Sequence, residues 1–147
     1  MKVDEIIESW KQDSVIDDVD LDREALKIPN LHAKYLKLLF EERVKLRSLN
    51  GKRKELKRVL GEYYRGDLNN PEDLTEINRE PWGKTVLKNE LNDYIDGDNE
   101  MVNLNTKIGY YEEVVSVLEE ILKALNNRNF QIKNAIDWRR LTNFGTG

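Results

Sequence analysis

The sequence predicts an all-α protein built from long helices that carry coiled-coil-like seams. Two long stretches show apolar residues at alternating steps of three and four, which is the spacing of a heptad seam. Charged residues make up 35% of the 147 residues and hydrophobic residues 39%. A chain of this composition forms exposed helices more readily than a thick core. We therefore expect part of its apolar surface to be buried between subunits.

The N-terminal part predicts a short amphipathic helix over residues 4–12 and an acidic connector over residues 13–20. A second helix is expected to begin near Asp20 or Asp22. Either aspartate can cap it, and acidic residues in the first turn suit the helix dipole. Pro29 lies several residues inside this helix, so we expect a kink or a restart there.

The first seam predicts a long helix packed against other helices. Asn50-Gly51 lowers the helix propensity near its middle and predicts a bend. Gly66 is the expected end of the helix. The seam consists of Tyr35, Leu39, Glu42, Leu46, Leu49, Arg53, Leu56, Leu60 and Tyr63.

The second long helix is expected to start near Asn99, after an aperiodic acidic stretch that holds two of the three prolines. A second apolar row beside its seam favours contacts with more than one neighbour, so we favour a seam between subunits over packing within one subunit. Residues 126–129 are expected to interrupt the helix before a shorter one that ends by Thr142. The seam consists of Ile108, Tyr111, Val115, Leu118, Leu122 and Leu125.

Three regions follow from these elements. Residues 1–65 form an N-terminal helical region that includes a basic helix, and residues 66–98 form an acidic linker region. Residues 99–147 form a C-terminal helical region that we expect to carry oligomerisation.

Charge is sorted along the chain. Residues 34–65 carry eleven Lys or Arg against four acids, a net charge of +7, although the whole chain has a net charge of −4. Concentrated cations favour polyanions, because each phosphate that they neutralise releases a condensed counterion. The alternatives are that this segment is a solvated helix face or pairs with an acidic segment of the chain.

Aromatic residues next to these cations favour a single strand, since unpaired bases can stack on rings while cations follow the phosphates. Tyr63 lies on the first seam, so Tyr64 is the better candidate for stacking. No recognition helix or zinc finger is indicated, and sequence-specific reading of a duplex is not expected. The candidate DNA-binding residues are Lys52, Arg53, Lys54, Lys57, Arg58, Tyr64 and Arg65.

The sequence offers little for catalysis. Gly83-Lys84-Thr85 resembles the end of a phosphate-binding loop, but Asn78 stands where that loop needs a glycine. The single histidine, His32, and the lack of cysteine exclude nucleophilic triads and histidine–cysteine metal sites. The acidic residues 17–22 could attract Mg²⁺, yet solvated acidic faces are common. We expect no enzyme, no cofactor, no metal and no membrane span.

Three patterns, in order and with matching separations, resemble the UvsY family of recombination mediators from T-even-like bacteriophages. They cover most of the chain. They are Asp13-x-x-Ile16-Asp17-x-x-x-Leu21-x-x-Glu24-Ala25 followed by Lys34-x-Leu36; Leu56-Lys57-Arg58-Val59-Leu60-Gly61-Glu62-Tyr63-Tyr64-Arg65-Gly66; and Lys84-Thr85-Val86-Leu87 with Arg128-x-Phe130-x-Ile132-Lys133-x-x-x-Asp137-x-Arg139.

The resemblance implies a non-enzymatic protein that binds single-stranded DNA in the cytoplasm of an infected bacterial host. It implies help in loading a RecA-like recombinase onto strand coated by single-strand-binding protein, and ring-like homo-oligomers of about six or seven subunits. The DNA-contacting basic pair of the family maps onto Lys57 and Arg58. One extra residue separates that pair from the tyrosines here, which leaves Lys54 as an alternative position.

Two other functions remain open at this point. A structural or adaptor coiled-coil oligomer, with its basic helix paired to acidic segments, would assemble without binding nucleic acid. A metal-dependent nuclease would instead degrade a strand in the presence of Mg²⁺.

Overall fold

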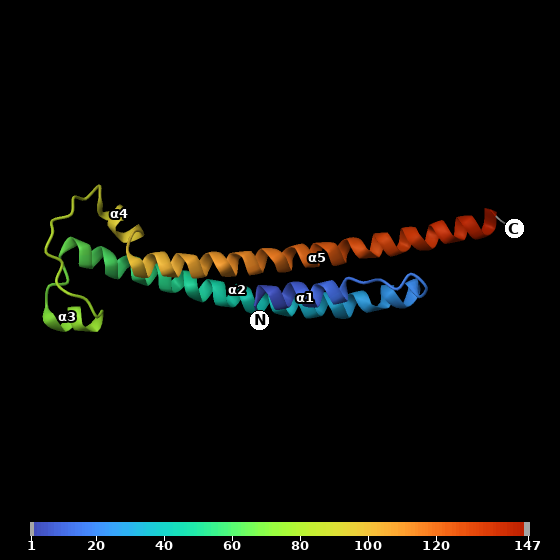
Figure 1. The fold of residues 1–147 in the computed structure, drawn as a ribbon, viewed down its shortest axis with the longest axis horizontal. Coiled ribbons are helices and arrows are strands. Elements are labelled where there is room, and N and C mark those ends of the chain that lie inside the picture. Colours follow the sequence, from blue (N-terminus) through green and yellow to red (C-terminus); the bar gives the residue numbers. More distant parts are fainter. Residues whose placement is uncertain (1, 146–147) are drawn as a thin grey trace. The chain divides into compact units, whose positions relative to one another are not determined.

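The computed structural model describes residues 2–145, which are all-α and contain no strand (Figure 1). The all-α prediction is confirmed. The helices are α1 (Val3–Asp13), α2 (Leu21–Arg65), α3 (Pro71–Glu76), α4 (Leu91–Asp96) and α5 (Asn99–Gly145).

The chain folds as two compact units. Unit 1 contains the described residues up to Val44 and those from Tyr111 onward, and unit 2 is Lys45–Tyr110. This division differs from the three regions expected from the sequence. Residues 66–98 do not connect two halves; they pack on parts of α2 and α5 in unit 2, and each long helix contributes to both units.

Unit 1 has a core where α1 packs against α2 and α5. Its members are Ile6, Tyr35, Leu39, Val114, Leu118, Ile121, Leu122 and Leu125. Polar contacts hold the end of α1: the Asp13 carboxylate accepts hydrogen bonds from Lys34 Nζ at 2.6 Å and from Tyr35 Oη at 2.7 Å. Burial, opposed by Ser9 and reinforced by Asp13, raises the pKa of Tyr35 to about 12.

The expected break of the last helix at residues 126–129 is wrong, because α5 runs through this segment. Arg128 is only 3% exposed, and its guanidinium donates to the carbonyl oxygens of Asp13 at 3.2 Å and Ser14 at 2.5 Å. Leu125 and Ile132 are buried on either side of it. These tertiary contacts outweigh the weak helix propensity of the neighbouring asparagines.

The expected restart at Pro29 is also wrong, since α2 includes this proline without a break. The neighbouring Ile28 and Leu21 are buried in a small cluster with Ile132 of α5. That packing offsets the backbone hydrogen bond that a proline cannot donate.

Unit 2 has its own core, which consists of Leu60, Tyr63, Tyr64, Leu74, Ile95 and Met101. The predicted end of α2 at Gly66 is confirmed. Gly66 has φ +82°, and the amide of Asp67 donates to the carbonyl of Glu62 at 2.9 Å while that of Gly66 donates to Tyr63 at 3.1 Å. This is a Schellman motif, which favours glycine at the left-handed position.

Candidate nucleic-acid interface

The part of α2 in unit 2 presents a group of open cations to solvent. Lys52, Arg53, Lys54 and Lys57 are all exposed, and the contacts of residues 2–145 include no ion pair for any of them. We call these four residues the open cations. Arg53 lies at a seam position by sequence, yet its side chain is exposed as well.

Two further candidate residues already carry acidic partners. The Arg58 guanidinium donates to Glu55 at 2.5 Å and to Glu62 at 2.9 Å, and these contacts raise the pKa of Arg58. Arg65 donates to Asp67 at 3.1 Å. A phosphate would have to displace these carboxylates, so the open cations are the stronger candidates for binding a polyanion.

Tyr64 lies in the core of unit 2 and not on its surface. It is 8% exposed, much like Tyr63 at 7%, and its hydroxyl donates to Asp98 Oδ2 at 2.6 Å. Its ring packs edge-on against Trp82, with 4.8 Å between ring centroids. A base could stack on Tyr64 only if this cluster opened. The expected preference for Tyr64 over Tyr63 therefore has no support in the packing.

Arg79 links Tyr64 to the start of α5. Its guanidinium makes a paired contact with the Asp98 carboxylate, at 2.6 and 2.8 Å, and a third contact with Glu100 at 2.9 Å. Burial alone would raise the pKa of Asp98, but the hydrogen bonds from Arg79 and Tyr64 hold it below its usual value. Sequence reasoning missed this network, because Arg79 lies in an aperiodic segment.

The seam of α5 that we assigned to oligomerisation packs within the subunit. Leu118 and Leu125 are 0% exposed, and they lie in the core of unit 1 with Leu122. Ile108 is buried in unit 2, while Tyr111 and Val115 are half-buried. For Leu118, Leu122 and Leu125, packing within one subunit describes the contacts better than an interface between subunits, because residues of α1 and α2 share their core.

A different apolar surface is open to solvent in unit 1. Leu26 is 80% and Phe40 67% exposed, and both lie on α2. Three more exposed apolar residues accompany them, and we call the set the α2 apolar stripe: Leu26, Ala33, Leu36, Phe40 and Val44. Successive members are seven, three, four and four residues apart, which places them on one side of the helix. The sequence analysis did not identify this stripe, although its spacing indicates one apolar side of a helix.

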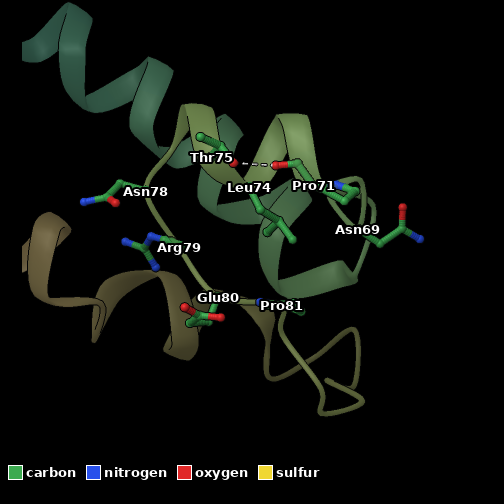
Figure 2. Close-up of a pocket in the computed structure, with 8 residues that line it drawn as sticks. All are labelled: Asn69, Pro71, Leu74, Thr75, Asn78, Arg79, Glu80 and Pro81. Carbon is green, nitrogen blue, oxygen red and sulfur yellow. Dashed lines mark hydrogen bonds between the residues drawn. The ribbon is translucent and has the colours of Figure 1, made fainter.

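Unit 2 also contains shallow hollows around α3. Figure 2 shows one of about 440 Å³, formed by α3 and the segment that follows it, where Thr75 Oγ1 donates to the carbonyl of Pro71 at 2.7 Å. Asn78 has φ +55° in this segment, a left-handed conformation that asparagine tolerates. Its lining mixes polar side chains with Leu74, Pro71 and Pro81.

Across residues 2–145, no three His, Cys, Asp or Glu side chains gather closely enough to hold a metal ion. Within the same range, no helix combines the length and apolar character needed to cross a membrane.

The fold and the basic helix together define a class: all-helical proteins that present a cationic helix to solvent. Within that class, the family model described as recombination, repair and ssDNA binding protein UvsY matches residues 9–145. The chain belongs to this family, as the three sequence patterns predicted.

Solved structures of one relative have the same fold. A crystal structure of the bacteriophage T4 recombination mediator protein UvsY is 22% identical, with a TM-score of 0.84 over 100% of this chain and 99% of that chain. A second crystal form is 21% identical, with a TM-score of 0.83 over 94% and 98%. None of the curated proteins compared with this chain matches it.

Proposed function

We propose that this protein is a recombination mediator that binds single-stranded DNA through the open cations of α2. The observation that carries the proposal is the set of four exposed Lys and Arg side chains without an acidic partner, on one helix of a family described as ssDNA-binding. Neutralising phosphates with such cations supplies affinity that does not depend on sequence. Arg58 and Arg65 lie close by and would join the contact after exchanging their carboxylate partners for phosphates.

The proposed role is to help a RecA-like recombinase load onto strand coated by single-strand-binding protein, in the cytoplasm of an infected bacterium. A ring-like assembly of subunits would present several basic helices at once, and linked weak sites act at high effective concentration. Holding the strand in a form that the recombinase binds better than the coating protein does shifts their competition.

We further propose that copies associate through the α2 apolar stripe. A protein with an exposed row of large apolar side chains leaves a surface that water solvates poorly. A second copy brings the same surface, and closed rings of identical subunits are a common outcome. This assigns association to residues that the fold leaves uncovered, in place of the α5 seam.

The binding proposal is tested by fluorescence anisotropy with a labelled single strand and its duplex over a salt series. The variant Lys52→Ala/Lys54→Ala/Lys57→Ala should bind more weakly at low salt, with a salt slope shallower by about 2 for three lost phosphate contacts. The matched control Lys107→Ala/Lys123→Ala/Lys133→Ala removes three exposed cations of α5 and should bind as the parent does.

The possible results separate the candidate functions. Equal losses in both variants would show a general charge effect and remove the assigned site. Absence of binding at low salt would favour the adaptor oligomer, and shortening of the labelled strand with Mg²⁺ would favour a nuclease. If binding is present, recombinase ATPase activity on coated strand, with and without this protein, tests the mediator role.

The association proposal is tested by analytical ultracentrifugation. Leu36→Ser/Phe40→Ser should reduce the assembly to smaller species without changing helix content, because both side chains are exposed. Leu87→Ser, which alters an exposed leucine of unit 2, is the control. An unchanged assembly in the double variant would place the interface elsewhere.

A further inference from the structure

A groove in unit 2 adjoins the basic helix and includes only Lys52 among the four open cations. Its volume is about 380 Å³, and its apolar floor comes from Leu56, Val59 and Leu60 of α2 together with Ile77 after α3. Leu56, Val59 and Ile77 are only half-buried, so the floor presents apolar surface to solvent. A groove of this size accepts one or two large apolar side chains.

Two charged residues of the groove have no ion pair among the contacts of residues 2–145: Lys52 on the α2 side and Glu76 on the α3 side. Glu55 pairs with Arg58 at 2.5 Å, and Glu100 pairs with Arg79 at 2.9 Å, so these rim acids are already neutralised. Glu76 is exposed, and the contacts of residues 2–145 give it no cation. The helix α3 that bears it has the sequence PEDLTE, with three acids and no basic residue.

We propose that this groove docks a segment of a partner protein that presents an apolar side chain flanked by Lys or Arg. The floor takes the apolar side chain, and the acidic wall of α3 attracts the flanking cations, which favours both the approach and the orientation of the segment. A nucleic-acid strand fits less well, since its phosphates would meet Glu76 and its neighbours. This inference goes beyond DNA binding and does not depend on it.

The groove lies next to the open cations of α2. Lys52 lines the groove and is also one of the open cations. A partner docked there lies next to the proposed strand, on the same unit. The groove would thus bring a basic partner protein and the DNA together, with Lys52 as the one open cation that also lines the groove.

The probe for this groove is a fluorescein-labelled peptide, Lys-Arg-Leu-Phe-Arg-Lys, measured by anisotropy against the full chain. Two control peptides replace Leu-Phe by Ser-Ser, or the four cations by acids. We expect the first peptide to bind at least about tenfold more tightly than either control, because it alone has both apolar and cationic groups. Equal binding of the serine peptide, or no binding of any peptide, would overturn the proposal.

Two matched charge-reversal variants test whether the peptide binds in the groove. Glu76→Lys and Glu90→Lys change the net charge equally, and both glutamates are exposed, but only Glu76 lines the groove. Glu76→Lys should weaken the peptide by about tenfold and Glu90→Lys by less than about twofold. Equal losses would show a general charge effect and refute the groove.

The same two variants keep this inference distinct from the proposed DNA binding. If the groove serves a protein segment, Glu76→Lys loses the peptide while its affinity for a labelled single strand stays within about twofold of that of Glu90→Lys. A large gain in strand affinity confined to Glu76→Lys, with peptide binding unchanged, would assign the groove to the strand and overturn the proposal.

Discussion

The exposed side of α2 differs between the two units. In unit 1 it carries the α2 apolar stripe, with Leu26 and Phe40 among its most exposed members. In unit 2 the same helix exposes charged residues, including the four open cations and the ion-paired Arg58. Apolar surface is most stable when protein covers it, whereas cations gain from phosphates. On the proposals above, one helix would serve self-association in one unit and DNA binding in the other.

If these proposals hold, self-association and DNA binding can be changed independently. Each unit has its own core, and the residues proposed for association and for DNA binding lie in different units. Substitutions on the surface of one unit should leave the other activity intact. Substitutions in a core should instead unfold the unit that contains them.

The largest expected effect is on the core of unit 1. Leu118→Asp places a carboxylate at a fully buried position, so we expect a loss of about 4–5 kcal/mol in the free energy of unfolding. Chemical denaturation followed by circular dichroism measures it. Phe130→Asp, at an exposed position of the same unit outside the α2 apolar stripe, should change stability by less than about 0.5 kcal/mol. Full stability of Leu118→Asp, with loss of assembly alone, would restore the α5 seam as an interface.

The next effect concerns unit 2. Arg79→Met leaves Asp98 buried without its guanidinium, and breaking such a pair costs on the order of 3 kcal/mol. Hydrogen exchange measured by mass spectrometry should show lost protection in α4 and in the first turns of α5. Protection around Leu118 in unit 1 should stay unchanged. Adding Asp98→Asn should recover part of the loss, and a double variant no better than Arg79→Met would argue against the pair.

The two long helices show which parts of the fold the sequence could predict. The heptad spacing identified which side of each long helix is apolar, and the buried Leu39, Leu60 and Leu118 agree with it. The spacing does not say which partner covers that side. The α5 seam was therefore assigned to other subunits, although Leu118, Leu122 and Leu125 pack with α1 and α2 of the same chain.

Local propensity was the weaker guide where tertiary contacts decide. The asparagines around Arg128 suggested a break, but the contacts of Arg128 with the end of α1 keep α5 intact. Arg79 and Asp98 are 19 residues apart in an aperiodic segment, and no local pattern joins them. Tyr64 was chosen for stacking because it lies off the seam, yet α3, α4 and Trp82 enclose it. Folded context is the missing information in each case.

A smaller effect is expected on stability at acid pH. The two units can be compared there through one carboxylate each, Asp98 in unit 2 and Asp13 in unit 1. Burial opposes ionisation of both, but their hydrogen bonds, to Arg79 and Tyr64 or to Lys34 and Tyr35, lower both pKa values. Carboxylates with a lowered folded-state pKa stabilise the protein above the unfolded pKa, near 3.9, and lose that contribution as pH falls through the folded value.

Each acid response should therefore follow one carboxylate. Asp98→Asn should flatten the pH dependence of stability below about pH 4 in unit 2 only, and Asp13→Asn should do so in unit 1 only. Hydrogen exchange at pH values from neutral to acid, corrected for the intrinsic exchange rate, resolves the two units. Identical acid profiles in both variants and the parent would mean that other carboxylates control acid unfolding.

The smallest effect tests whether a cation without a partner contributes more than a paired one. Lys54→Gln and Lys57→Gln should each make the salt slope of single-strand binding shallower by about 0.7, since each removes one phosphate contact. Arg58→Gln should change the slope less, because Arg58 must first release Glu55 and Glu62, and the freed glutamates then repel the strand.

Glu55→Gln/Glu62→Gln should conversely tighten binding and make the slope of the salt dependence steeper, because it leaves Arg58 as a fifth cation without an acidic partner. If Arg58→Gln has the larger effect, the family's basic pair, and not the open cations, dominates the contact. Because all of these side chains lie in unit 2, self-association through unit 1 should stay unchanged throughout.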